Sequence, residues 1–260
     1  CFLMSELNVL TYNVNGVRAA IKNGLLQWLS DKDFDVICLQ EIKVALEDFD
    51  PKPFEALGYT CYLFPAQKKG YSGVAIFSKI KPDSVVRGMG VPEYDAEGRN
   101  IRIDIGDLSI LSAYFPSGTT GDERQSVKMS YLDAMYDYLH ELKKTRPNYL
   151  VCGDFNICHT EIDIHNPIQN KDTSGFKPEE RAWMTKFFDS GFVDTFRVLN
   201  PQPNQYSWWS YRANARQNNK GWRIDYIAAS KTLEGKVKSS RMYPDAVHSD
   251  HCPVFCKVEL

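Results

Sequence analysis

The chain has 260 residues, of which 43% are hydrophobic and 25% charged, and its formal net charge is −2. This composition is typical of a folded globular protein and argues against long disorder. No apolar run approaches the ~20 residues of a membrane span, and the N-terminus lacks a signal-peptide pattern. Seven cysteines without paired or clustered spacing indicate free thiols in a reducing compartment. We therefore predict a soluble intracellular protein, with residues 1–3 interpreted as a remnant of cloning.

The first part of the chain predicts two strands and a helix. Residues 7–12 alternate apolar and polar side chains before becoming fully apolar, which is typical of a strand. Apolar residues at helical spacing between positions 17 and 29 predict one helix. Residues 34–39 form an apolar run without alternation, as expected for a strand covered on both faces. The two strands end in polar pairs, Asn13 with Asn15 and Gln40 with Glu41.

The middle of the chain predicts antiparallel strands followed by a long helix. The short strand segments are 59–64, 73–78, 85–88, 101–105 and 108–114. Gly106-Asp107 between the last two is typical of a tight hairpin. A helix is expected from about residue 122 to residue 144, with acidic residues at its start and lysines at its end.

The last part of the chain predicts a further strand, a helix and four more strands. The helix begins at Pro178 and stops at Gly191. The four strands are expected at 206–211, 222–230, 237–243 and 254–258. Because no linker or change of composition divides the chain, we predict a single domain over residues 1–260. Strand-to-helix units recur in both halves, which suggests two similar halves packed sheet against sheet.

The segment from Leu150 to Asn156 is the strongest local indication of a site. An apolar strand is broken by Gly153, after which Asp154 and Asn156 project to the same side. Ligands of open α/β sheets bind outside such strand ends. The alternative, a strand that ends in an Asx turn, is the commoner fate of this pattern in isolation.

Further carboxylates and amides stand at the predicted strand ends. The full set is Asn13, Asn15, Glu41, Asp154, Asn156, Asp225 and Asp250. Oxygen ligands of this kind suit Mg²⁺ or Mn²⁺ and do not suit structural zinc. The alternative for Glu41 alone is an exposed acid after a strand.

The segment before the last strand places Asp250 beside His251. Histidine is the side chain most readily used as an acid or base near neutral pH, and Asp225 is a candidate to orient it. The alternative is an Asp-His pair on the surface. Two basic clusters interleaved with aromatic residues are either nucleic-acid contacts or solvated loops. They comprise Lys68, Lys69, Lys79 and Lys81, and Arg212, Arg216, Lys220 and Arg223.

An aromatic stretch offers a wall for a stacked base or an extruded nucleotide. Neighbouring residues of a strand face opposite ways, so one arrangement buries Trp209 and turns Trp208 towards a pocket with Trp222 and Ile224. Two packed sheets that cover both tryptophans are the alternative.

These motifs, in this order, resemble the exonuclease III / apurinic-apyrimidinic (AP) endonuclease family along essentially the whole chain. The segments that carry the resemblance are Asn13–Arg18, Leu39–Lys43, Gly70–Val74, Tyr114–Gly118, Cys152–Asn156, Gly221–Tyr226 and Ser249–His251. The resemblance implies a four-layer α/β sandwich of two packed mixed β-sheets flanked by helices. It implies Mg²⁺-dependent hydrolysis of the phosphodiester 5′ to an abasic site, which leaves a 3′-hydroxyl and a 5′-deoxyribose phosphate. Activities implied beside it are 3′–5′ exonuclease and 3′-end cleaning.

The same resemblance implies roles for individual residues. Catalytic roles fall on Asp154, Asn156, His251, Asp225, Tyr114 and Asn13. Roles near the metal, Mg²⁺ with Mn²⁺ as a substitute, fall on Glu41, Asn15 and Asp250. Contacts to DNA or to the lesion fall on Trp208, Trp222, Ile224, Arg212, Asn170, Asn166, Tyr71, Lys43 and Arg18. Relatives often carry Lys-Asn where this chain has Asp172-Thr173, so engagement of the DNA strand by that loop is in question.

The implied partner is double-stranded DNA with an abasic site or a blocked 3′ end, bound by a monomer without a membrane. The implied location is the cytoplasm of a bacterium, in association with the nucleoid, or the nucleus of a eukaryote. Three alternatives remain open: an enzyme that is chiefly a 3′–5′ exodeoxyribonuclease or 3′-phosphatase, a phosphodiesterase of the same fold with another phosphate ester, and a catalytically silent DNA-binding scaffold. Every expected catalytic position holds a competent residue, which argues against the scaffold.

Overall fold

The computed structural model describes residues 4–260, whose main strands form two six-stranded mixed sheets. The strands of the first sheet are β1 (Glu6–Asn13), β2 (Val36–Gln40), β3 (Thr60–Phe64), β4 (Val74–Ser78), β13 (Val237–Met242) and β14 (Val254–Glu259). Their order across the sheet is β13-β14-β1-β2-β4-β3. The strands of the second sheet are β5 (Ser84–Arg87), β6 (Asn100–Ile105), β7 (Leu108–Tyr114), β8 (Asn148–Asp154), β9 (Phe192–Asp194) and β12 (Asp225–Ser230). Their order is β5-β6-β7-β8-β12-β9.

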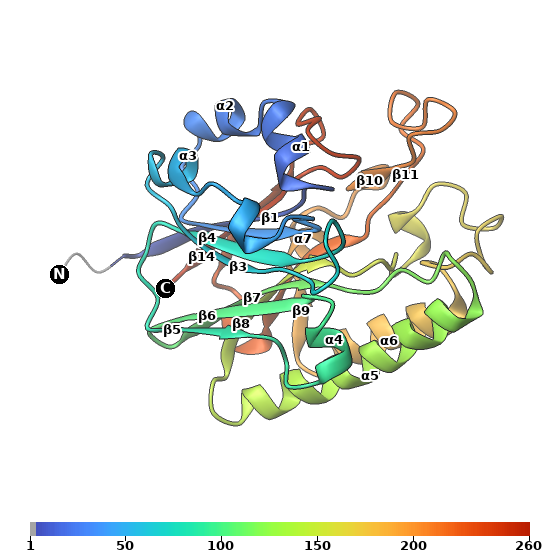
Figure 1. The fold of residues 1–260 in the computed structure, drawn as a ribbon. Coiled ribbons are helices and arrows are strands. Elements are labelled where there is room, and N and C mark those ends of the chain that lie inside the picture. The colour runs from blue at the N-terminus through green and yellow to red at the C-terminus, as the bar shows by residue number, and fades with distance from the viewer. Residues whose placement is uncertain (1–3) are drawn as a thin grey trace.

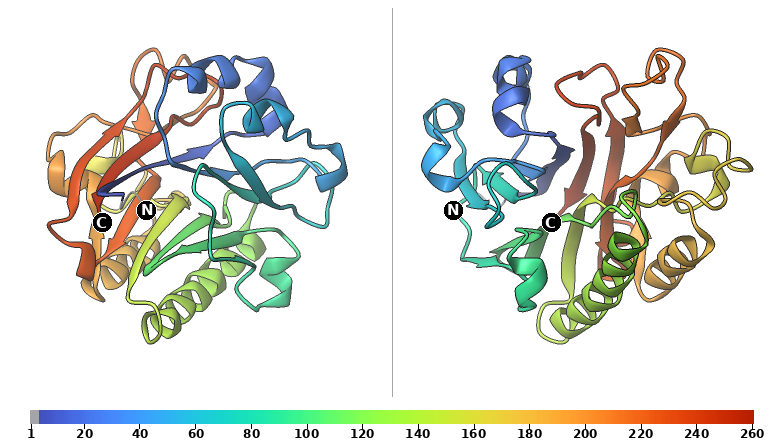
Figure 2. Two further views of the ribbon diagram at one scale, coloured as in Figure 1. Left: turned by 90° about the vertical axis from the view of Figure 1, so that its left-hand side faces the viewer. Right: turned by 45° about the vertical axis from the view of Figure 1, so that its right-hand side comes forward.

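The described residues form seven α-helices, most of which cover the outer faces of the two sheets. They are α1 (Val17–Lys22), α2 (Leu25–Ser30), α3 (Lys52–Glu55), α4 (Pro92–Asp95), α5 (Asp122–Lys143), α6 (Pro178–Asp189) and α7 (Thr195–Leu199). Helices α1, α2 and α3 lie outside the first sheet, and α5 and α6 lie outside the second (Figure 1). Figure 2 shows the same layers from two further directions. None of the helices described combines the length and apolarity needed to cross a membrane.

Three apolar layers hold this sandwich together. The central layer packs Val9 and Val36 of the first sheet against Ile110 and Cys152 of the second. A second layer joins the first sheet to α1 and α2, and a third joins the second sheet to α5 and α6. Every residue of β2 is buried because the strand is covered on both faces, as its unbroken apolar run predicts. The four-layer α/β sandwich is therefore confirmed.

Most predicted elements are found close to their expected limits. The hairpin at Gly106-Asp107 joins β6 to β7, with Ile105 paired to Leu108. The long helix is α5, and the helix that begins at Pro178 is α6. All six cysteines among residues 4–260 are free, in agreement with the prediction from their spacing. The interpretation of residues 1–3 as a cloning remnant lies outside the described residues.

The structure corrects four details of the predicted fold. The helix expected over 17–29 is two helices, because Gly24 has a left-handed backbone (φ 99°) between α1 and α2. The strand expected at 206–211 shrinks to β10 (Trp208–Trp209), which pairs with β11 (Gly221–Trp222). The strand expected at 222–230 is interrupted between β11 and β12. The sheets are not two halves of the chain, because β13 and β14 return to pair beside β1.

Candidate active site

Strand pairing brings the predicted polar residues to one end of the two sheets. Strands β1 and β2 run parallel, so that Glu41, which follows β2, lies beside Asn13 at the end of β1. Strands β7 and β8 are also parallel and pair Tyr114 with Asp154. Strand β12 runs antiparallel to β8 and pairs Asp225 with Asp154. Side chains that are distant in the sequence therefore meet because of the register of the strands.

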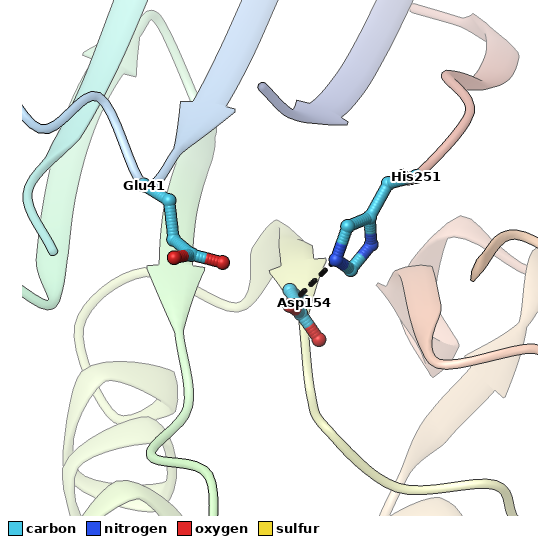
Figure 3. Close-up of side chains that lie close together, drawn as sticks. All are labelled: Glu41, Asp154 and His251. Atoms are coloured by element: carbon cyan, nitrogen blue, oxygen red, sulfur yellow. Dashed lines mark ion pairs between the residues drawn. The ribbon is translucent and has the colours of Figure 1, made fainter. Parts of the chain in front are cut away.

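Glu41, Asp154 and His251 form the centre of this site (Figure 3). One ligand-type atom from each of them lies within 4.8 Å of the others. Asn13 links the two carboxylates, because its Nδ2 donates to Glu41 Oε1 at 2.7 Å and to Asp154 Oδ2 at 2.8 Å. We refer to these four residues as the acidic cluster.

His251 is held between two carboxylates. Its Nδ1 lies 2.8 Å from Asp225 Oδ2, which confirms the predicted pairing, and its Nε2 lies 3.6 Å from Asp154 Oδ2. Burial lowers the pKa of the imidazole, but the charges of Asp225 and Asp154 outweigh burial and raise that pKa above its usual range. The imidazole is therefore a cationic hydrogen-bond donor at neutral pH, with Nε2 directed towards Asp154.

The carboxyl group of Asp154 is fully buried, and its pKa is raised. Burial raises its pKa, and the nearby carboxylates of Asp225 and Glu41 raise it further, against the opposing effect of His251. Its Oδ1 accepts a hydrogen bond from the backbone N–H of Asn156 at 2.9 Å. A carboxyl group with a raised pKa in a cleft is suited to accept a proton during catalysis.

Asp250 and Asn15 lie beside the acidic cluster. Asn15 Nδ2 donates to Asp250 Oδ1 at 3.2 Å, and Lys43 Nζ donates to Asn15 Oδ1 at 2.6 Å. The same lysine Nζ lies 3.4 Å from Glu41 Oε2. Trp208 Nε1 donates to the other oxygen of Asp250 at 3.1 Å. The three residues expected near a metal are thus joined through Asn15 and Lys43.

The donor atoms of the site fit a hard divalent cation. Glu41 and Asp154 present carboxylate oxygens, with Asp250 and the amide of Asn15 next to them. Oxygen donors of this type suit Mg²⁺, which keeps several waters and needs only one or two protein carboxylates. His251 Nε2 lies in the same group of ligand-type atoms, while its Nδ1 is held by Asp225.

A cavity of about 310 Å³ opens beside the acidic cluster. Its apolar wall consists of Trp208, Trp222 and Ile224, which pack on buried Phe176. Trp208 and Trp222 meet edge to face with ring centroids 5.9 Å apart. Trp209 is buried on the opposite side, in agreement with the arrangement predicted from strand alternation.

Tyr114 and Asn156, which are predicted as catalytic residues, also line the cavity, whereas Tyr71, Arg18, Asn170 and Arg212, which are expected at DNA, are not among its lining residues. Tyr71 donates to Glu97 at 2.8 Å, and Arg18 donates to the carbonyl of Lys43 at 3.2 Å. Asn170 closes a turn by donating to the carbonyls of His165 and Asn166. Arg212 is exposed on the 210–220 loop and is not among the residues that line the cavity.

Arg223 corrects the prediction of a basic cluster around residues 212–223. Its guanidinium is fully buried and pairs with Asp163 at 2.8 Å and with Asp194. Arg216 is half-buried, because it stacks on Trp209 and donates to the carbonyls of Ser249 and Ala246. These two arginines therefore hold the framework of the site and are not free to contact a polyanion.

We expect Asp163→Asn to destabilise the protein by about 3–5 kcal/mol at neutral pH, because Arg223 and Arg197 lose a buried counter-charge. Burial alone would raise the pKa of Asp163, but the two arginines outweigh it and lower that pKa to about 2. The stabilisation by Asp163 is therefore complete above about pH 4 and is lost as the pH falls through about 2. Urea unfolding at pH 7 and at pH 3 measures the effect, which should be smaller at pH 3. Equal losses at both pH values, or a similar loss in the exposed Asp133→Asn control, would contradict this account.

The sequence prediction missed part of the cavity wall. The missed residues are Ser117, Thr119, Lys128, Thr173, Ser174 and Gly175. The serine and threonine residues among them lie in loops, where no regular spacing in the sequence indicates which side chains face a cavity. Lys128 lies at helical spacing from buried Tyr131 and Leu132 and is only 1% exposed, a burial that is unusual for a lysine.

Comparisons with known proteins show the family to which the chain belongs. A family model described as the endonuclease/exonuclease/phosphatase family matches residues 10–251. The chain is 42% identical over 250 residues to an exodeoxyribonuclease of Bacillus subtilis (strain 168), a match that covers 95% of this chain and 98% of that protein. It is 35% identical over 264 residues to a DNA-(apurinic or apyrimidinic site) endonuclease of Dictyostelium discoideum, covering 98% of this chain and 72% of the relative.

The fold is also similar to that of a solved AP endonuclease from Archaeoglobus fulgidus. The two structures superpose with a TM-score of 0.88 at 30% sequence identity, and the match covers 98% of this chain and 100% of the other. The residues matched by the family model run from β1 to His251 and thus include the whole acidic cluster.

Proposed function

Because this chain belongs to the exonuclease III / AP endonuclease family of nucleases, we propose that it incises double-stranded DNA on the 5′ side of abasic sites. The products are a 3′-hydroxyl and a 5′-deoxyribose phosphate. The observation that carries the proposal is the acidic cluster, His251 included, beside a small cavity with an aromatic wall. We further propose that residues 1–260 act as one domain and as a monomer, in the compartment that holds the DNA.

Hydrolysis of a phosphodiester needs a base for the water, a counter-charge for the phosphoryl oxygens and help for the leaving oxygen. Asp154 takes the proton from the attacking water, because burial gives its carboxylate a raised affinity for protons. Asn13 and the backbone N–H of Asn156 hold this carboxylate at its two oxygens. The water is thereby aligned for in-line attack on the phosphorus.

His251 donates from Nε2 to a non-bridging oxygen of the phosphate while Asp225 holds Nδ1. The Tyr114 hydroxyl, which burial keeps protonated by raising its pKa, is placed to donate to the same phosphate. Both donors are fixed before the substrate arrives, so charge that develops in the transition state meets oriented hydrogen bonds.

Glu41, with Asp250 and Asn15 beside it, is the group that would hold Mg²⁺, and Mn²⁺ would substitute for it. When bound, the ion neutralises charge on the phosphate and stabilises the leaving 3′-oxygen. Trp208, Trp222 and Ile224 accept the sugar without a base, for which a cavity of about 310 Å³ has room. DNA on either side of the lesion would contact Arg18, Lys43, Tyr71, Asn166, Asn170 and Arg212.

Replacement of Glu41 by glutamine should raise the Mg²⁺ concentration needed for half-maximal incision by about 10–100-fold. The amide keeps the hydrogen bond from Asn13 but loses the negative charge that attracts the cation. Titration of single-turnover incision with MgCl₂ measures the shift, and Glu47→Gln, an exposed glutamate near α3, is the control. An unchanged Mg²⁺ requirement in Glu41→Gln would place the metal elsewhere.

A second candidate function is predominant 3′–5′ exonuclease activity. It is favoured by the match to the exodeoxyribonuclease of Bacillus subtilis. The test compares a duplex that carries one abasic-site analogue with an undamaged duplex that has a recessed 3′ end, each with Mg²⁺ and with EDTA. Incision at the lesion supports the proposed function, trimming without incision supports the second candidate, and neither activity would refute both.

A further inference from the structure

A fully buried ion pair lies directly behind the candidate active site. Lys128 of α5 pairs with Glu180 of α6, and their side chains are 1% and 0% exposed. Removing two charges from water is costly, so a buried ion pair is weak evidence for a gain in stability. Lys128 also lines the cavity, although the catalytic steps above do not use it.

Lys128 contacts the turn that carries the catalytic carboxylate. Its Nζ donates to the carbonyl of Asn156 at 2.7 Å. Asn156 has a left-handed backbone (φ 53°), which costs free energy unless its surroundings hold it. The N–H of this residue donates to Asp154, and its side-chain amide donates to the carbonyl of Phe115 at 2.7 Å. The backbone carbonyl of Asn156 accepts from Lys128, so both backbone polar groups of this residue are held by side chains.

Glu180, the partner of Lys128, holds the loop on the other wall of the cavity. Its Oε1 accepts from the backbone N–H groups of Gly175 and Lys177 at 2.7 and 2.9 Å. Gly175 packs so closely on Trp222 that an added Cβ would lie 2.8 Å from the indole ring. The ion pair therefore ties the turn after β8 to the loop that supports the aromatic wall.

We propose that Lys128 is a positioning residue, which holds the 154–156 turn in the geometry for proton transfer and links it through Glu180 to the sugar pocket. Lys128 need not touch the substrate in this role. The inference rests on the proposed function for its kinetic readout and on the geometry of the turn for its structural readout.

The decisive comparison is between Glu180→Gln and the double variant Lys128→Met/Glu180→Gln. Both keep the side-chain oxygen that caps the 175–177 loop, and only the double variant loses the donor to Asn156. The double variant also leaves no buried charge without a partner, so it should fold as well as Glu180→Gln. We expect its kcat for abasic-site incision to be about 10–100-fold below that of Glu180→Gln, with KM within about threefold, because only alignment is lost.

The structural readout is amide hydrogen exchange of residues 153–158, which should be about tenfold faster in the double variant than in Glu180→Gln. The matched control is Lys144→Met/Glu141→Gln, which removes an exposed lysine–glutamate pair near the end of α5 and should change neither readout. Equal kcat and equal exchange in the single and the double variant would overturn the inference, as would a loss of kcat that only follows the loss of folded protein. Absence of incision by the unmodified protein would refute the proposed function instead, and exchange would still decide the role of Lys128.

Discussion

Replacing Asp154 with asparagine is expected to lower kcat for abasic-site incision by about 10²–10⁴-fold, with little change in KM. Asparagine has nearly the same shape and can still accept the hydrogen bond from the N–H of Asn156. It cannot accept the proton of the attacking water, so the loss falls on the chemical step. Single-turnover incision of a duplex with one abasic-site analogue measures kcat without interference from product release.

The interpretation of this variant depends on two controls. Asp189→Asn, at an exposed position at the end of α6, should leave kcat unchanged. The affinity of Asp154→Asn for the lesion duplex in EDTA should match that of the unmodified protein, because the DNA contacts lie elsewhere. A kcat within about threefold of the unmodified protein would remove Asp154 from the role of base.

His251→Gln should lower kcat by about 10²–10³-fold, the usual cost of removing one oriented donor from a developing oxyanion. The same variant should change the pH dependence of kcat/KM. In the unmodified protein kcat/KM rises as Asp154 loses its proton and falls at alkaline pH as His251 loses its own. The alkaline fall should lie well above pH 7, because Asp225 and Asp154 raise the pKa of His251 despite burial.

If His251 donates as a protonated imidazole, the decrease of kcat/KM at alkaline pH should disappear in His251→Gln. The increase of kcat/KM on the acid side should remain. Asp225→Asn should move that fall to lower pH without removing it, since the imidazole keeps Asp154 but loses its closest counter-charge. An alkaline fall that is identical in all three proteins would contradict a protonated His251.

Much of the candidate site can be predicted from the sequence, because it is built at the ends of buried strands. Strand β8 runs through Gly153 and ends at Asp154, so the break expected at Gly153 is wrong, but Asp154 still stands at the strand end, as Asn13 does in β1. Parallel pairing brings the ends of neighbouring strands together. The polar residues that follow the apolar runs of the sequence therefore include most of the acidic cluster. The pairing of His251 with Asp225 is also accessible, because a functional histidine needs an orienting carboxylate.

Other features depend on contacts that local pattern does not encode. Arg223 looks like a member of a basic patch, yet it is buried by Asp163 and Asp194, which lie 60 and 29 positions away. Lys128 has no neighbour in the sequence that explains its burial, because its partner Glu180 lies on a different helix. Gly24 separates α1 from α2, although the apolar residues continue at helical spacing across it. A single glycine in such a pattern is compatible with one continuous helix or with two, so the spacing alone does not predict the break.

The chemical groups left at the nick distinguish metal-dependent hydrolysis from other routes of cleavage at an abasic site. A duplex with one natural abasic site, labelled on both sides of the lesion, is incubated with the protein in Mg²⁺ and in EDTA. We expect incision only with Mg²⁺, with a 3′-hydroxyl that a DNA polymerase extends at once and a 5′-deoxyribose phosphate on the other side. Cleavage that persists in EDTA and leaves an unsaturated aldehyde at the 3′ end would mean elimination through an amine, and would contradict hydrolysis by the acidic cluster.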